Sequence, residues 1–158
     1  LDEETIAFIK EVVKEKKIHT LWFEAHYMYR KKLASFTEQF APAKVKFRCG
    51  VETFDTALRE TWKKGIPSSV SVQDIAQHFQ GICLLCCTQG ETKEHILKDI
   101  ELAKAHFEYF SVNVFCDNHT PIKQDKELAS WFAKEVYPMI KDDPRIEVLM
   151  ENTDLGVG

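Results

Sequence analysis

Helical and extended patterns alternate along this chain, and the alternation restricts its fold more than any other feature. In the segment 92–110, Ile96, Ile100, Ala103 and Phe107 recur at helical spacing and form one apolar stripe. Strands that alternate with helices pair in parallel through right-handed crossovers. The expected helices are 5–16, 30–40, 57–64, 71–79, 92–110 and 125–140, and the expected strands are 18–26, 44–52, 81–87, 111–118 and 145–151.

Most of the expected strands have one apolar face and one mixed or polar face. In 44–52, KVKFRCGVE, Val45 and Phe47 alternate with Lys46 and Arg48. A doubly wound sheet buries both faces, so we expect instead an α/β fold with a parallel-stranded partial (βα) barrel of TIM-barrel type and about five strands. An α+β sheet with one face in solvent is the alternative. The residues expected on a common concave surface are Glu24, Arg48, Glu52, Asn113 and Glu147, and those expected to meet helices are Val45, Phe47, Val112, Val114 and Ile146.

Polar residues follow the apolar part of each expected strand. The carboxyl ends of parallel strands, with the loops after them, are where α/β folds build their sites. The pattern therefore predicts a site at this end of the sheet, although loops are polar in most proteins. The residues concerned are Glu24 and His26, Glu52 with Thr53 and Asp55, Thr88 with Gln89, Asp117 with Asn118 and His119, and Glu151 with Asn152 and Asp154.

Composition and charge restrict the class of protein. The 158 residues, of which 44% are hydrophobic, suit one globular domain. With 21 Lys and Arg against 25 Asp and Glu, the net charge of −4 provides no general field for nucleic acid or an anionic membrane. The basic clusters 14–17, 30–32 and 63–64 are interpreted as solvated helix ends. No apolar run has the length of a membrane span and no signal peptide opens the chain, so we expect a cytoplasmic protein. Five cysteines is an odd count, which favours reduced thiols in a reducing compartment.

Three cysteines occur within five positions, at 83, 86 and 87. On a strand Cys83 and Cys87 point to one face and Cys86 to the other, so their thiolates do not converge on one metal ion. No second closely spaced Cys or Cys/His pair completes a zinc or iron–sulfur pattern. We therefore predict no metal ligands in this chain and interpret the cysteines as buried structural residues.

Three segments carry a resemblance to a known family. The segments KFRCGVETFDTALRETWKKGI (46–66), GICLLCCTQGETKEHILKDIELA (81–103) and SVNVFCDN (111–118) resemble the fourth, fifth and sixth strands of radical S-adenosylmethionine (SAM) enzymes. The resemblance extends from Thr5 through the last expected strand. It implies a six-stranded partial barrel of βα units that holds SAM across the strand ends, a [4Fe–4S] cluster, and a 5′-deoxyadenosyl radical acting on an unknown small-molecule substrate.

The chain also departs from the family pattern. The three-cysteine loop C-x-x-x-C-x-x-C after the family's first strand and the glycine-rich acidic motif after its second strand are missing, and both would lie before Leu1. The fifth-strand glycines of the family are unmatched too. We therefore expect 1–158 to be a single domain and a fragment of a larger radical SAM barrel, inactive alone and without a stably bound cofactor.

The resemblance implies several site residues. Glu52 stands where the family places a polar group beside the ribose or methionine moiety of SAM, and a carboxylate accepts hydrogen bonds from hydroxyl or ammonium donors. Leu85 and Cys86 after Leu84, and the strand from Phe115 to Asp117, are the implied backbone walls for adenine. An ordinary structural role is the alternative for each.

The candidates for substrate binding are the lumen residues Glu24, Arg48, Asn113 and Glu147. The alternative function for the whole chain is a stand-alone α/β small-molecule binding module without redox chemistry. Nucleic-acid binding is a third and weaker alternative, suggested only by the aromatic and basic residues of 21–32, LWFEAHYMYRKK.

Overall fold

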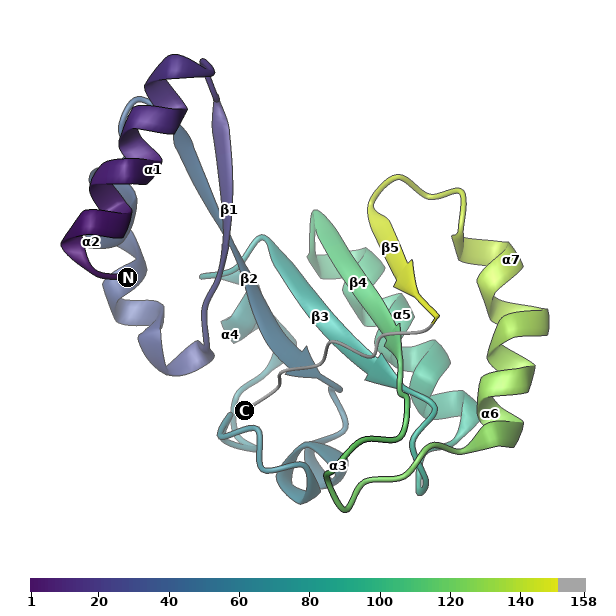
Figure 1. Ribbon diagram of the computed structural model, residues 1–158. Helices are drawn as coiled ribbons and strands as arrows, with labels where there is room; N and C mark the ends of the chain where they lie inside the picture. The colour runs from purple at the N-terminus through teal and green to yellow at the C-terminus, as the bar shows by residue number, and fades with distance from the viewer. Residues whose placement is uncertain (151–158) are drawn as a thin grey trace.

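The fold is a five-stranded parallel sheet with its helices on one face (Figure 1). The structure is a computed structural model and describes residues 1–150. The strand order is β1-β2-β3-β4-β5, so each strand pairs with its neighbour in sequence, and every pairing is parallel. The strands are β1 (Thr20–Glu24), β2 (Lys44–Glu52), β3 (Gly81–Cys86), β4 (Tyr109–Val114) and β5 (Ile146–Leu149). The predicted partial barrel of about five parallel strands is confirmed.

The helices that follow β2, β3 and β4 begin where the sequence offers a capping side chain. Asp55, Thr92 and Asp125 accept backbone N–H bonds at the starts of the helices that follow β2, β3 and β4. The caps therefore start each crossover helix at the carboxyl end of its strand. The helices are α1 (Glu3–Glu15), the 3₁₀ helix η1 (Tyr27–Lys32), α2 (Leu33–Glu38), α3 (Thr56–Thr61), α4 (Val72–Ala76), α5 (Lys93–His106), α6 (Lys126–Trp131), the π-helical turn η2 (Phe132–Val136) and α7 (Tyr137–Ile140).

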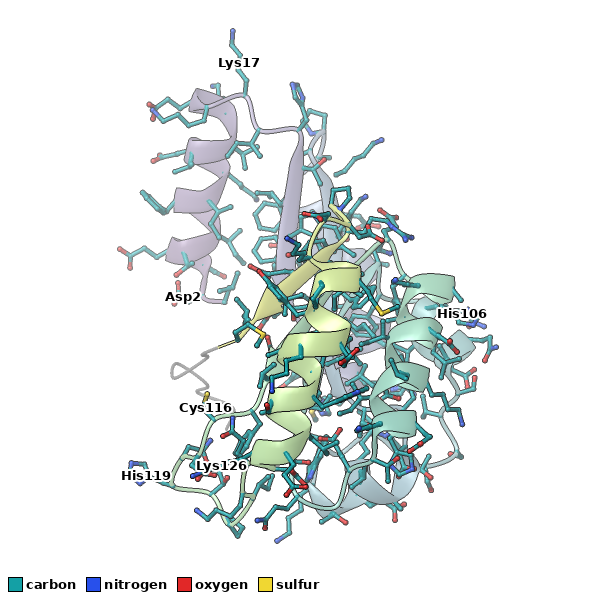
Figure 2. All side chains as sticks on the ribbon, turned by 90° about the vertical axis from the view of Figure 1, so that its right-hand side faces the viewer. Asp2, Lys17, His106, Cys116, His119 and Lys126 are labelled. Atoms are coloured by element: carbon teal, nitrogen blue, oxygen red, sulfur yellow. The ribbon has the colours of Figure 1, made fainter. Side chains whose placement is uncertain are left out.

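The two ends of the sheet are easily told apart. Figure 2 shows Lys17 at the top of the molecule, His106 at about mid-height, and Cys116, His119 and Lys126 below it. His106 ends α5, whereas Lys126 begins α6 after β4. The loops after the strands therefore gather at the end marked by Cys116 and His119.

The apolar face of the sheet forms the core under the helices. Phe47, Val112, Val114 and Ile146 are buried in one cluster, and Val45 packs against it, as the alternation predicts. Within residues 1–150 no helix is both long and apolar enough to cross a membrane. The polar residues Glu151, Asn152 and Asp154 that were expected to follow the last strand lie outside the described residues.

Two sequence predictions are wrong in detail. The helix predicted to reach residue 110 ends at His106, because Tyr109 and Phe110 pair with Gly81 and Ile82 of β3. Cys87 does not share the face of Cys83: its φ of 68° ends the alternation, and its sulfur lies in the core 3.7 Å from that of Cys86.

Candidate functional site in the lumen and at the strand ends

Two ion pairs of one arginine show that the sheet is curled. Arg48 on β2 contacts Glu24 on β1 at 2.5 Å and Glu147 on β5 at 3.6 Å. In a flat sheet, four strand spacings would separate β1 from β5 by roughly 19 Å. Side chains from the two edge strands reach one arginine because the sheet wraps around its polar face. That face is therefore the wall of a concave lumen, as predicted for Glu24, Arg48 and Glu147.

Aromatic side chains cluster on the lumen face toward the amino ends of the strands. The rings of Trp22 and Tyr109 lie 5.9 Å apart between centroids, and the ammonium group of Lys46 lies 5.4 Å from the Trp22 ring. Gly81 between them leaves the necessary room, because a Cβ there would lie 2.9 Å from the carbonyl oxygen of Tyr109 and 3.1 Å from the Trp22 ring. Lys46 is further paired with Glu108. We call this cluster of Trp22, Lys46, Glu108 and Tyr109 the floor of the lumen.

Polar groups line the lumen above the floor. The Tyr109 hydroxyl donates to Glu147 at 2.9 Å, and burial together with this bond raises the pKa of Tyr109 to about 12. The Cys83 thiol lies 3.7 Å from the Glu24 carboxylate, and burial raises the pKa of Cys83 to about 11, so it is a neutral thiol at neutral pH. Asn113 is 5% exposed, and its Oδ1 has no partner among residues 1–150.

A pocket of about 400 Å³ opens where β2, β3 and β4 end. Its size lies in the range that holds small ligands and cofactors. Apolar side chains and one ion pair share its walls. The lining residues are His26, Glu52, Trp62, Lys63, Lys64, Gly65, Leu85, Phe115, Asn118, Thr120 and Ile122.

Glu52 is the buried acid of this pocket. It has a φ of 68°, which is strained for a residue with a side chain, and only 5% of it is exposed. Lys64 lies 2.9 Å from its carboxylate. Burial raises the pKa of Glu52, and the charge of Lys64 only partly offsets this. A strained, desolvated carboxylate at the rim of a pocket is typical of a functional group.

Two neighbours hold the Glu52–Lys64 pair in place. The Nε2–H of His26 donates to the carbonyl oxygen of Lys64 at 2.6 Å, and the backbone N–H of Met28 donates to its Nδ1, so the ring is the neutral Nε2–H tautomer in this arrangement. Gly50 leaves room for the carboxylate, because a Cβ there would lie 3.3 Å from Oε1 of Glu52. His26, after β1, and Gly50, in β2, therefore help to position the Glu52 carboxylate and its partner Lys64.

The structure brings together some of the predicted cofactor residues and not others. Glu52, Leu85 and Phe115 line the same pocket. The side chain of Cys86 lies in the core, and its carbonyl oxygen accepts the N–H of Phe115. The carboxylate of Asp117 accepts the N–H of Gln124 and shapes the loop after β4. The predicted roles of Cys86 and Asp117 beside the cofactor stay predictions.

Sequence reasoning missed Lys64. The charge pattern places it at a solvated helix end, but only 13% of its side chain is exposed, and it pairs with Glu52. The loop that carries Lys64 and the end of β2 that carries Glu52 come together only in the folded chain. The signal available in the sequence was Gly65 with Pro67, which marks the end of a helix and the return of the chain toward the sheet.

Residues 1–150 contain no group of three or more His, Cys, Asp or Glu side chains that could hold a metal ion. Cys83 faces the lumen, whereas Cys86 and Cys87 are buried in the core, so these residues do not fit an iron–sulfur cluster. Whether this chain holds a cluster is tested by reconstitution.

Comparison with known proteins identifies the family. No family model and no curated protein matches the chain. Among solved structures it is similar to a queuine lyase from Clostridium spiroforme bound to SAM and queuine, with 36% sequence identity and a TM-score of 0.89. The match covers 100% of this chain and 68% of that one. That lyase is a radical SAM enzyme, and at this identity and coverage the chain described here belongs to the radical SAM enzyme family.

Proposed function

We propose that this chain forms the cofactor- and substrate-binding barrel of a radical SAM lyase that acts on queuine or a closely related 7-deazaguanine base. The observation that carries the proposal is the match over the whole chain to a queuine lyase with both ligands bound. The pocket at the strand ends and the polar lumen beside it supply two adjoining binding regions in one half-barrel.

The residues of the strand-end pocket fit SAM. Leu85, Phe115 and Ile122 offer apolar surface to an adenine ring. Glu52 offers a carboxylate to ribose hydroxyls or to the ammonium group of the methionine moiety, and Lys64 offers a cation to its carboxylate. The charged pair of the pocket thus complements the zwitterionic end of the cofactor.

SAM supplies, on one-electron reduction, the carbon-centred radical that removes a hydrogen atom from a substrate. The described residues hold no cluster site, so the source of the electron is not assigned to them. Their role is to bind and orient. Glu52 and Lys64 fix one end of SAM, Leu85 and Phe115 exclude water from it, and the lumen holds the substrate alongside.

The test compares this function with that of a binding module without redox chemistry. The full-length protein that contains residues 1–158 is purified and reconstituted anaerobically, and dithionite, SAM and queuine are added. We expect 5′-deoxyadenosine to form in a queuine-dependent manner and queuine to be consumed, both followed by liquid chromatography and mass spectrometry. SAM binding in calorimetry without any 5′-deoxyadenosine would support the binding module instead.

A further inference from the structure

The lumen contains a buried amide that lacks a partner. Asn113 lies near the carboxyl end of β4, and only 5% of it is exposed in a chain that carries no ligand. Its Oδ1 is buried and has no hydrogen-bond donor among residues 1–150. A buried acceptor without a donor destabilises a fold, so such groups commonly mark a place where another molecule binds.

The carboxylates Glu24 and Glu147 on the lumen face carry more negative charge than Arg48 neutralises. Glu24 and Glu147 share the single guanidinium of Arg48, so this cluster has a net charge of −1. The side chains of Glu24 and Glu147 are 64% and 44% exposed, and each carboxylate keeps lone pairs free toward the lumen.

The donors that contact Glu24 and Glu147 are already engaged by these two carboxylates. Arg48 donates to Glu24, and the hydroxyl of Tyr109 donates to Glu147. The thiol of Cys83 points to Glu24. The surface left for a ligand therefore consists mainly of acceptors, and a ligand that fits it presents N–H donors.

The positions of Asn113 and Glu147 suit one planar ligand. Ser111 pairs with Glu147 and Asn113 pairs with Leu149, so Asn113 and Glu147 are diagonal neighbours on the same face of adjoining strands. Trp22 and Tyr109 lie on the same polar face toward the amino ends of the strands and line a pocket of about 350 Å³ with Glu24 and Arg48.

We infer that the lumen selects bases with a 2-amino-6-oxo edge, with the Asn113 amide pairing with N1–H and O6 and the Glu147 carboxylate accepting from the 2-amino group. This inference rests on the proposed function and deepens it by naming the part of the base that is read. Asn113 binds any 6-oxo base, whereas Glu147 supplies the selectivity for the amino group.

The experiment measures binding of two probes by calorimetry in the presence of SAM. The probes are 7-deazaguanine and 7-deazahypoxanthine, which differ only in the 2-amino group. A hydrogen bond to a charged acceptor predicts a preference for 7-deazaguanine of roughly 10- to 100-fold. In Glu147→Gln the preference should fall to roughly 3- to 10-fold, because a neutral hydrogen bond is about half as strong.

Asn113→Leu separates the two roles. It should weaken the binding of both probes by about 10-fold and leave their ratio unchanged, since both bases present N1–H and O6. Glu101→Gln, on the exposed side of α5, is the matched control and should change neither value. Circular dichroism checks that each variant is folded, and either variant tests its own half of the inference if the other fails to fold.

The outcomes distinguish this inference from the proposed function. Equal affinity for the two probes in the unaltered protein, or an unchanged preference in Glu147→Gln, would overturn the inference while leaving SAM binding and the radical SAM function intact. Absence of SAM binding in the same titrations would overturn the proposed function and the inference with it.

Discussion

Replacing Glu52 by glutamine separates a carboxylate that serves a ligand from one that serves the fold. The side chain is 5% exposed, with Lys64 at 2.9 Å. Because burial raises its pKa above the ordinary glutamate value of 4.5, the folded protein binds more protons than the unfolded chain in the range above 4.5, and ionisation of Glu52 reduces stability as the pH rises. A neutral amide at this position removes that cost and still accepts a bond from Lys64.

The expected result has two parts. At pH near 7.5 the unfolding free energy of Glu52→Gln should equal or exceed that of the unaltered protein. The affinity for SAM should fall by roughly 10- to 100-fold, because a hydrogen bond to a charged acceptor contributes about 1.5–3 kcal/mol and each 1.4 kcal/mol is a factor of ten. An ionised side chain that lies buried in a pocket and lowers the stability of the fold is typical of a binding residue.

The assay measures both quantities on one sample, by urea denaturation and by calorimetric titration with SAM. Glu101→Gln on α5 is the matched control and should change neither. If Glu52 is purely structural, removing its charge should cost stability, up to about 3–5 kcal/mol for a broken buried pair. That loss, together with an unchanged SAM affinity, would refute the reasoning.

Three further results are expected. Glu91 is 8% exposed, and burial raises its pKa from 4.5 to about 7, so the folded carboxyl keeps its proton between these values. The unfolding free energy should therefore fall by on the order of 3 kcal/mol between about pH 5 and about pH 8. Glu91→Gln should flatten this pH dependence in urea denaturation. Gly81→Ala should cost about 1–3 kcal/mol in the same assay and alter the near-ultraviolet circular dichroism of Trp22, whereas an unaffected midpoint would show that the floor can move aside. A polypeptide of residues 1–158, reconstituted anaerobically with iron and sulfide, should not retain the visible absorbance of a stoichiometric cluster; such a cluster, lost on changing Cys86 and Cys87 to serine, would contradict the prediction.

The sequence by itself determined the strands, their faces and the class of fold. Alternation with a period of two depends only on local backbone geometry, so KVKFRCGVE placed Phe47 in the core and Arg48 in the lumen without knowledge of any neighbour. Helix starts were also readable, because capping by Ser71 or Thr92 is a contact within one turn. The parallel pairing of the strands followed from the alternation of helices and strands.

Only the tertiary structure decided which side chains meet across the lumen. Arg48 bridges Glu24 and Glu147 because the sheet curls, and the amount of curl depends on the packing of all five strands. Lys64 was expected in solvent and instead pairs with Glu52, since the loop after α3 folds back over the end of β2. Cys87 left its expected face through a positive φ that no local pattern announces. Local periodicity acts over a few residues, whereas burial and pairing depend on contacts between residues far apart in sequence. The sequence pattern therefore identified the face of the sheet that carries the site, and the tertiary structure determined which side chains contact one another there.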